Sequence, residues 1–290
     1  MNHSLMSNLN ELLKVLDLKK VETNVYNGIS KDIGSPTVYG GHVLAQALRA
    51  ATETVPNDRF AHSLHAYFIL AGDVNQEIQY QVEIIRNGNS FTTRRVTAKQ
   101  NDKAIFVLAA SFQIKEEGFE HQIHMPNITP PDSLRSYADL AKDYLGEENA
   151  KQFWLMSPNR PIDFRPVEII EPLKPAKRSP FRHVWFKSTG ELPDDQHIHR
   201  QVMAYASDFN LLLTSLQPHG IGLLDGKMQI ASLDHAMWFH DDAKVDDWLL
   251  MAIESPMAGG ARGFSRSKIF TKEGKLVASV AQEGLIRVRG

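Results

Sequence analysis

The sequence predicts an α+β fold built in tandem, in which each half is a long helix wrapped by an antiparallel sheet. Residues 22–113 and residues 167–287 both show a helical apolar pattern followed by several strand-like runs. A polar stretch rich in proline separates these two zones. A helix with one apolar face needs a sheet to cover it, so one sheet around one helix, formed twice, satisfies both zones.

The first zone predicts one helix and four strands. Apolar residues recur at helical spacing from Val43 to Ala51, directly after the bare backbone of Gly40 and Gly41. The strand-like runs that follow lie at residues 63–70, 77–86, 90–99 and 103–112. Asn87-Gly88 and Asn101-Asp102 separate the last three runs, and both pairs are typical of hairpin turns.

The second zone repeats this order after two early strands near residues 167–170 and 183–187. Asp194 or Asp195 can cap a helix whose apolar stripe runs from Ile198 to Phe209. Further strand-like runs lie at residues 229–239, 248–254, 264–271 and 275–287. We therefore expect an N-terminal unit at residues 1–115, a connector at residues 116–165 that could hold a helix over residues 137–153, and a C-terminal unit at residues 166–290.

Composition limits the functions that this chain can have. Its 290 residues include 32 Lys and Arg against 34 Asp and Glu, a formal net charge of −2 that argues against general nucleic-acid binding. The absence of cysteine excludes disulfides, thiolate nucleophiles and Cys-ligated metal centres. No run approaches the roughly 20 apolar residues of a membrane span, and the N-terminus lacks the pattern of a signal peptide. We expect a cytoplasmic protein without a membrane span.

Motifs for common cofactors and metals are missing. The sequence contains no G-x-S-x-G elbow, no phosphate-binding loop and no H-E-x-x-H helix. Histidines occur in pairs, but His62 and His65 are three apart on a predicted strand and would point to opposite faces. We therefore expect neither a metal nor another cofactor.

Three polar residues of the second half stand beside apolar patterns. Asp208 flanks the helical stripe, Ser232 begins a strand, and Gln282 shares one face of the last strand with apolar residues. An unpaired buried polar group costs about 1–3 kcal/mol, so Gln282 needs partners on the helix, among them Asp208. The spacing by itself fits a hydrogen-bonded core network at least as well as a catalytic site.

Several segments, taken in order, resemble the type II acyl-CoA thioesterases, a double-hotdog family of bacteria and peroxisomes. They are YGGHVLAQAL (residues 39–48), HSLHAYF (62–68), RNGNSF (86–91), RRV (94–96), YASDFN (205–210), QPHGIG (217–222), IASLDHAMWFH (230–240) and AQEG (281–284). The resemblance implies a double hotdog that hydrolyses medium- to long-chain fatty acyl-CoA, with Asp208, Ser232 and Gln282 as the catalytic triad. Some members of the family carry Thr where this chain has Ser232.

The chemistry leaves three functional alternatives. Asp208 can activate a water held by Ser232 and Gln282, which is the route we favour. Ser232 can instead attack the thioester and form an acyl-enzyme. A double hotdog that binds acyl-CoA without hydrolysing it is the third possibility.

Substrate contacts are harder to assign from the sequence. The helix start at Gly40 and Gly41 is our candidate for the oxyanion donor. Apolar residues that could line an acyl tunnel, although ordinary core explains most of them, are Phe209, Leu211, Leu212, Leu213, Met237 and Trp238. The candidates for binding the phosphates of coenzyme A are Arg94, Arg95, Arg262 and Arg266.

The resemblance also implies how the protein assembles and where it acts. The family is commonly homotetrameric, and hotdog sheets have edges that favour association, so we expect a homotetramer. The sequence ends Arg287-Val288-Arg289-Gly290 rather than in a Ser-Lys-Leu type of peroxisomal address, which favours a bacterial cytoplasm.

Overall fold

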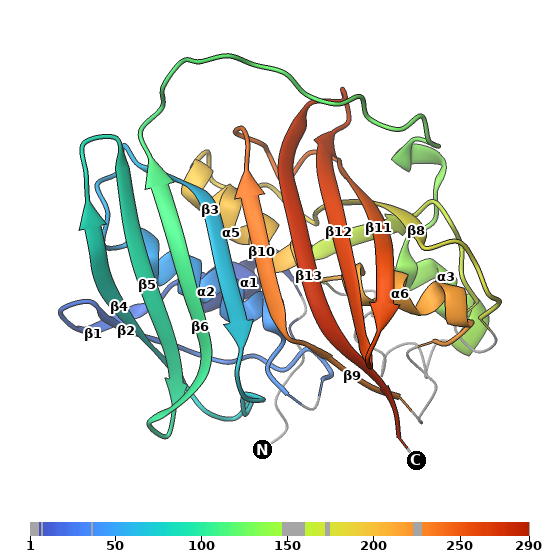
Figure 1. Ribbon diagram of the computed structural model, residues 1–290, viewed down its shortest axis with the longest axis horizontal. Coiled ribbons are helices and arrows are strands. Elements are labelled where there is room, and N and C mark those ends of the chain that lie inside the picture. The colour runs from blue at the N-terminus through green and yellow to red at the C-terminus, as the bar shows by residue number, and fades with distance from the viewer. Residues whose placement is uncertain are drawn as a thin grey trace.

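The computed structural model describes residues 6, 8–35, 37–146, 160–171, 175–222 and 228–289. Within these residues a single antiparallel sheet runs through the whole molecule (Figure 1), in the strand order β1-β2-β4-β5-β6-β3-β10-β13-β12-β11-β8-β7. β9 pairs with β13 beside this path. The central strands β3 and β10 pair with each other and so join the sheets of the two halves into one continuous sheet.

Each half contributes about the same set of strands. Those of the first half are β1 (Lys19–Glu22), β2 (Val25–Gly28), β3 (Phe60–Phe68), β4 (Ile78–Asn87), β5 (Phe91–Gln100) and β6 (Lys103–Gln113). Those of the second half are β7 (Ile162–Pro166), β8 (Phe181–Ser188), β9 (Met228–Ser232), β10 (Asp234–Phe239), β11 (Leu249–Gly259), β12 (Arg262–Thr271) and β13 (Leu276–Val288).

The helices of the described residues lie mainly on one side of the sheet (Figure 1). They are α1 (Leu9–Leu16), α2 (Gly40–Thr52), α3 (Tyr137–Leu145), α5 (Gln196–Ser207) and α6 (Leu211–Leu216), with short 3₁₀ turns at Pro131–Ser133 and Gln217–His219. No helix in this part of the chain is both long and apolar enough to cross a membrane.

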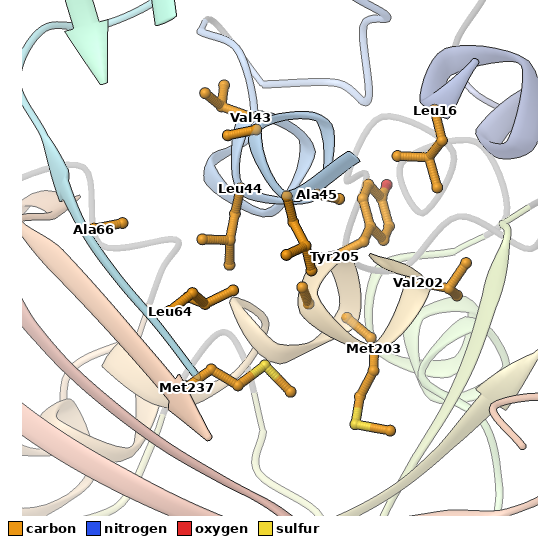
Figure 2. Packing of buried hydrophobic residues seen from close by; sticks show 14 of the residues in the cluster. Leu16, Val43, Leu44, Ala45, Leu64, Ala66, Val202, Met203, Tyr205 and Met237 are labelled. Atoms are coloured by element: carbon orange, nitrogen blue, oxygen red, sulfur yellow. The ribbon is translucent and has the colours of Figure 1, made fainter. Parts of the chain in front are cut away.

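The core lies where α2 and α5 pack against each other behind the central strands. Figure 2 shows Leu44 of α2 and Met203 of α5 pointing toward Leu64 of β3 and Met237 of β10, and all four are almost completely buried. The buried positions of α2 are rich in Ala and Gly, which lets the two helices come close. A Cβ at Gly41 would collide with the carbonyl oxygen of Tyr205.

The predicted tandem α+β double hotdog is confirmed, and most elements lie where the sequence pattern predicts them. The four strands of the first zone correspond to β3, β4, β5 and β6. The helix of the second zone corresponds to α5, and its cap is Asp195, whose carboxylate accepts the His197 N–H at 2.8 Å. The pattern did not reveal α1, β1, β2 or α6.

Two elements differ clearly from the prediction. The strand expected near residues 167–170 is β7, at Ile162–Pro166, because the Glu168 carboxylate takes the His183 N–H at 2.7 Å and so ends the ladder with β8. β7 thus falls mostly in the segment predicted as connector. Of the helix expected over residues 137–153, α3 covers Tyr137–Leu145, and residues 147–153 lie outside the described residues.

The run at residues 229–239 divides into two strands. The Asp234 carboxylate accepts the Glu283 N–H at 2.6 Å, and the Leu233 N–H donates to the Glu283 carbonyl at 3.0 Å. On one side of this break Ser232 pairs with Gly284, and on the other Ala236 pairs with Ala281, so the register shifts by one residue. Such a bulge turns the following side chains to the other face of the sheet.

Candidate active site

The three polar residues singled out by the resemblance meet at one point. Asp208 is the C-cap of α5, and its side chain is only 5% exposed. Its Oδ1 accepts a hydrogen bond from Gln282 Nε2 at 2.5 Å and from Ser232 Oγ at 3.4 Å. Gln282 Nε2 also donates to Ser232 Oγ at 3.1 Å, so each member of the trio contacts the other two.

The bulge in the second half explains this convergence. Ser232 lies opposite Gly284, two residues from Gln282 on β13, and side chains two apart on a strand share a face. Beyond the bulge His235, three residues after Ser232, is also fully buried on the helix side. On a regular strand residues three apart point to opposite faces, so the extra residue is what brings both toward Asp208.

The first half of the chain supplies the other wall of the site. The Gly41 N–H, in the first turn of α2, donates to the Asp208 carboxylate. A helix N-terminus stabilises a nearby anion through its free N–H groups and its dipole. Gly40 lies so close that a Cβ there would stand 2.6 Å from Asp208 Oδ2. A carboxylate from one half is thus held by the backbone of the other.

Burial changes the acidity of this carboxylate. Removal from water raises the pKa of Asp208 from 3.8 to about 6, because burial disfavours the charged form. Hydrogen bonds from Gln282, the Gly41 N–H and Ser232 act in the opposite direction and limit the rise in pKa. The result is a carboxylate that is ionised near neutral pH and more basic than an exposed one.

An apolar cavity of about 430 Å³ opens beside this carboxylate. Its polar end holds Asp208, Ser232 and Gly40, and its walls come from both halves. The apolar wall residues are Val38, Tyr39, Val43, Phe68, Ile69, Leu70, Ala71, Ile105, Phe106, Phe209, Leu212, Leu213, Ile230, Ala231 and Leu233.

The acyl-wall candidates separate into two groups. Phe209, Leu212 and Leu213 line the cavity. Leu211 and Met237 belong to the buried core, while Trp238 is 36% exposed and stacks edge-on against His65.

The four candidate arginines do not line the cavity. Arg94 is 1% exposed and its guanidinium donates to Thr54, Asn87 and the carbonyls of two neighbouring residues, which makes it a structural group. The other three pair with surface carboxylates: Arg95 with Glu83, Arg262 with Glu283, and Arg266 with Glu254.

The histidines engage in individual contacts. His62 bonds to Ser111 Oγ at 2.8 Å, and His199 Nδ1 accepts the Val245 N–H at 3.1 Å. Across the residues that the structure describes, no group of three or more His, Cys, Asp or Glu side chains could hold a metal ion.

Sequence reasoning missed two parts of the site. It treated Gly41 as a possible oxyanion donor, whereas its N–H is directed at Asp208. It also passed over His235, whose ring lies next to Asp208. The sequence does show His235 as an ionisable residue within an apolar strand pattern. It does not show the bulge that turns this side chain inward.

The fold and the site together define a double-hotdog protein of the thioesterase class. Residues 153–285 match the family described as acyl-CoA thioesterase, and residues 30–113 match the acyl-CoA thioesterase N-terminal domain. The sequence is 40% identical over 286 residues to acyl-CoA thioesterase 2 of Haemophilus influenzae, which spans 96% of this chain and 98% of that protein. The chain belongs to the acyl-CoA thioesterase family.

Other relatives agree with this assignment. Human acyl-coenzyme A thioesterase 8 is 37% identical, over 95% of this chain and 88% of its own length. The crystal structure of an acyl-CoA thioesterase II from Mycobacterium marinum superposes with a TM-score of 0.77 at 38% identity, covering 96% of this chain and 99% of the other. A hotdog-fold protein from Alicyclobacillus acidocaldarius reaches the same TM-score at 14% identity, which supports the fold alone.

The close approach of Gly40 to the Asp208 carboxylate gives a prediction. Gly40→Ala should lower kcat/KM by at least about tenfold, because the added methyl group would displace Asp208 Oδ2 from its place against α2. Steady-state hydrolysis of palmitoyl-CoA, followed by thiol release, measures the effect. Ala50→Gly, at a buried position of the same helix far from its first turn, serves as the control for general damage to α2. Wild-type activity in Gly40→Ala would contradict the tight fit of this carboxylate.

Proposed function

We propose that this protein hydrolyses medium- to long-chain fatty acyl-CoA to free fatty acid and coenzyme A, with Asp208 as general base for a water held by Ser232 and Gln282. The observation that carries the proposal is a buried, basic carboxylate at the polar end of an apolar cavity. Family membership supports the substrate class, since the Haemophilus influenzae relative is an acyl-CoA thioesterase.

The cavity fits one part of such a substrate. Its volume of about 430 Å³ and its apolar walls suit an acyl chain, while the nucleotide of coenzyme A is too large and too charged to share it. The thioester would then lie at the polar end beside Asp208 and Ser232, with the pantetheine arm leaving toward the surface.

The reaction needs little help for its leaving group. A thiol has a pKa near 8.5, so the departing sulfur leaves readily, and the demanding step is delivery of an oriented water. Asp208 accepts a proton while the water oxygen forms a bond to the thioester carbon. The tetrahedral intermediate then collapses, the carbon–sulfur bond breaks, and Asp208 returns its proton to the thiolate. General-base catalysis of this kind contributes about 10²–10⁴-fold.

The developing oxyanion needs a hydrogen-bond donor. The Gly41 N–H already donates to Asp208, so our candidate is the Gly40 N–H at the same helix start, where Gly40 lines the cavity. A donor of this type is worth about 10²–10³-fold in kcat.

The geometry favours water over Ser232 as the nucleophile. A serine and its base are normally about 2.6–3.2 Å apart, whereas Ser232 Oγ and Asp208 Oδ1 are 3.4 Å apart. Gln282 donates to Ser232 Oγ as well, so Ser232 and Gln282 form one hydrogen-bonded pair beside Asp208 that can orient a water. A purely acyl-CoA-binding role is less well supported, since binding an acyl chain does not require a carboxylate to be buried against its preference for water. The homotetramer and the bacterial cytoplasm expected from the resemblance stay predictions.

Removal of the base gives the first test. Asp208→Asn should lower kcat by about 10²–10⁴-fold, measured as thiol release from palmitoyl-CoA. Glu283→Gln, which changes a neighbouring but surface-paired carboxylate, should retain activity. Near wild-type turnover in Asp208→Asn would remove Asp208 from the role of base.

The melting temperature of the same variant, relative to that of the wild type, should be higher at pH 8 than at pH 5. Burial raises the pKa of Asp208 from 3.8 in the unfolded chain to about 6 in the folded protein. The ionised carboxylate therefore lowers the stability of the folded protein fully above about pH 6. This loss disappears as the pH falls from about 6 to the pKa of the unfolded chain. Asn removes this loss. An equal difference in melting temperature between the variant and the wild type at pH 8 and at pH 5 would contradict the burial of an ionised Asp208, because hydrogen bonds that Asn cannot make are lost at both pH values.

The pH profile of kcat/KM gives a second test. Since the base must be deprotonated, activity should fall about tenfold per unit below pH 6, where Asp208 takes up its proton, and should level off above it. An activity that stays flat down to pH 5 would show that the base has an ordinary carboxyl pKa.

Mass spectrometry distinguishes the two nucleophiles. Rapid quenching of a single turnover with a slow substrate should show no acyl group on the protein, because water attacks directly. An acylated peptide containing Ser232, absent in Ser232→Ala, would replace the water route by the covalent one.

A further inference from the structure

His235 lies directly behind the proposed base and has no part in the mechanism described so far. It comes from β10, is fully buried, and its Nδ1 is 3.9 Å from Asp208 Oδ1. Its Nε2 is 2.9 Å from the hydroxyl of Ser207, the residue before Asp208 on α5. The imidazole therefore bridges the end of α5 and the carboxylate without reaching hydrogen-bond distance of the carboxylate itself.

The protons in this chain of contacts can be assigned. Ser207 Oγ lies 2.9 Å from the Ala204 carbonyl oxygen, which can only accept, so the single hydroxyl proton satisfies that bond. Ser207 Oγ then accepts a hydrogen bond from His235 Nε2–H, and both contacts are satisfied. The opposite tautomer would leave an Nδ1–H donor with no acceptor within hydrogen-bond range, which costs more than an unused lone pair.

This tautomer leaves the lone pair of Nδ1 facing the carboxylate. Nδ1 is buried and has no hydrogen-bond partner among the described residues. A lone pair beside a carboxylate oxygen repels the ionised form and favours the protonated one. The effect adds to burial and opposes the donors on the other side of Asp208.

We propose that His235 is a positioning residue for Asp208: held as the Nε2–H tautomer by Ser207, it presents a lone pair to the carboxylate and keeps that base stronger than its hydrogen bonds alone would leave it. The inference rests on the proposed role of Asp208 as base. His235 itself stays neutral, because burial lowers its pKa to about 3.

The other ionisable groups around Asp208 do not duplicate this effect. Tyr39, at the start of α2, donates its hydroxyl to the Tyr205 carbonyl, and burial raises the pKa of both phenols, so they are neutral. The charge of Arg160 lowers the pKa of both phenols, but burial has the larger effect. On the strands, the Asp234 carboxylate is bonded to the Glu283 N–H, and Glu283 itself pairs with Arg262. All of them are unchanged in the variants below.

The test is the acidic limb of kcat/KM against pH in Ser207→Ala and His235→Gln. Ser207→Ala removes the acceptor of Nε2–H, so the neutral ring can take the Nδ1–H tautomer, whose N–H dipole faces Asp208 and favours the ionised carboxylate. His235→Gln keeps an amide near Ser207 and removes the lone pair at Nδ1. In both variants we expect the limb to move to lower pH by about half a unit or more.

Ser215→Ala is the matched control. Ser215 is also buried and its hydroxyl also donates to the carbonyl three residues earlier, that of Leu212, but it lies on α6. The Ser215→Ala variant should show the acidic limb of kcat/KM at the wild-type pH. If the acidic limb of kcat/KM in Ser207→Ala stays at the wild-type pH or moves to higher pH, the proposed role of His235 is wrong. This holds whatever the change in melting temperature.

The outcome separates this inference from the proposed function. If Asp208→Asn remains active, the proposed base is wrong and the His235 role falls with it. If Asp208→Asn is inactive and the limb of Ser207→Ala and His235→Gln does not move, Asp208 is the base and His235 only fills space.

Discussion

The structure depends on the contact between the Asp208 carboxylate and the first turn of α2. That contact requires α2 and α5 to approach almost backbone to backbone, which the glycines at 40 and 41 allow, since a Cβ at either would meet Asp208 or Tyr205. The same approach closes the core between the helices and the sheet. The contact between the end of α5 and the start of α2 therefore contributes to the core and also positions the Asp208 carboxylate.

The two halves repeat a fold but not a site. The C-cap of α5 is the buried Asp208, whereas the C-cap of α2 is Glu53, which forms a surface ion pair with Arg49. In the hairpin β12–β13 Gln282 pairs with Ser265, while in the corresponding hairpin β5–β6 the buried guanidinium of Arg94 stands opposite Ala110 and bonds to Thr54. The first half thus holds a buried structural arginine in this hairpin, whereas the second half holds the amide that donates to Asp208.

The sequence predicted the fold better than the geometry of the site. Period-two and helical patterns located the strands and α5 because these elements each bury one face. Residue spacing alone did not distinguish a site at Asp208, Ser232 and Gln282 from a core network, and the family resemblance singled them out. The inward turn of both Ser232 and His235 depends on a one-residue bulge set by the Asp234 carboxylate, a tertiary contact that no local pattern encodes. The burial of Arg94 is similar, since a strand arginine normally faces solvent.

The proposed function requires that the Asp208 carboxylate is buried, ionised near neutral pH and more basic than an ordinary aspartate. The most direct measurement is its own titration, followed by ¹³C NMR of carboxyl-labelled aspartate and assigned by the signal that disappears in Asp208→Asn. A midpoint near pH 6 is what the structure predicts. A midpoint near 4, the value of an exposed aspartate, would show that burial does not make Asp208 a stronger base.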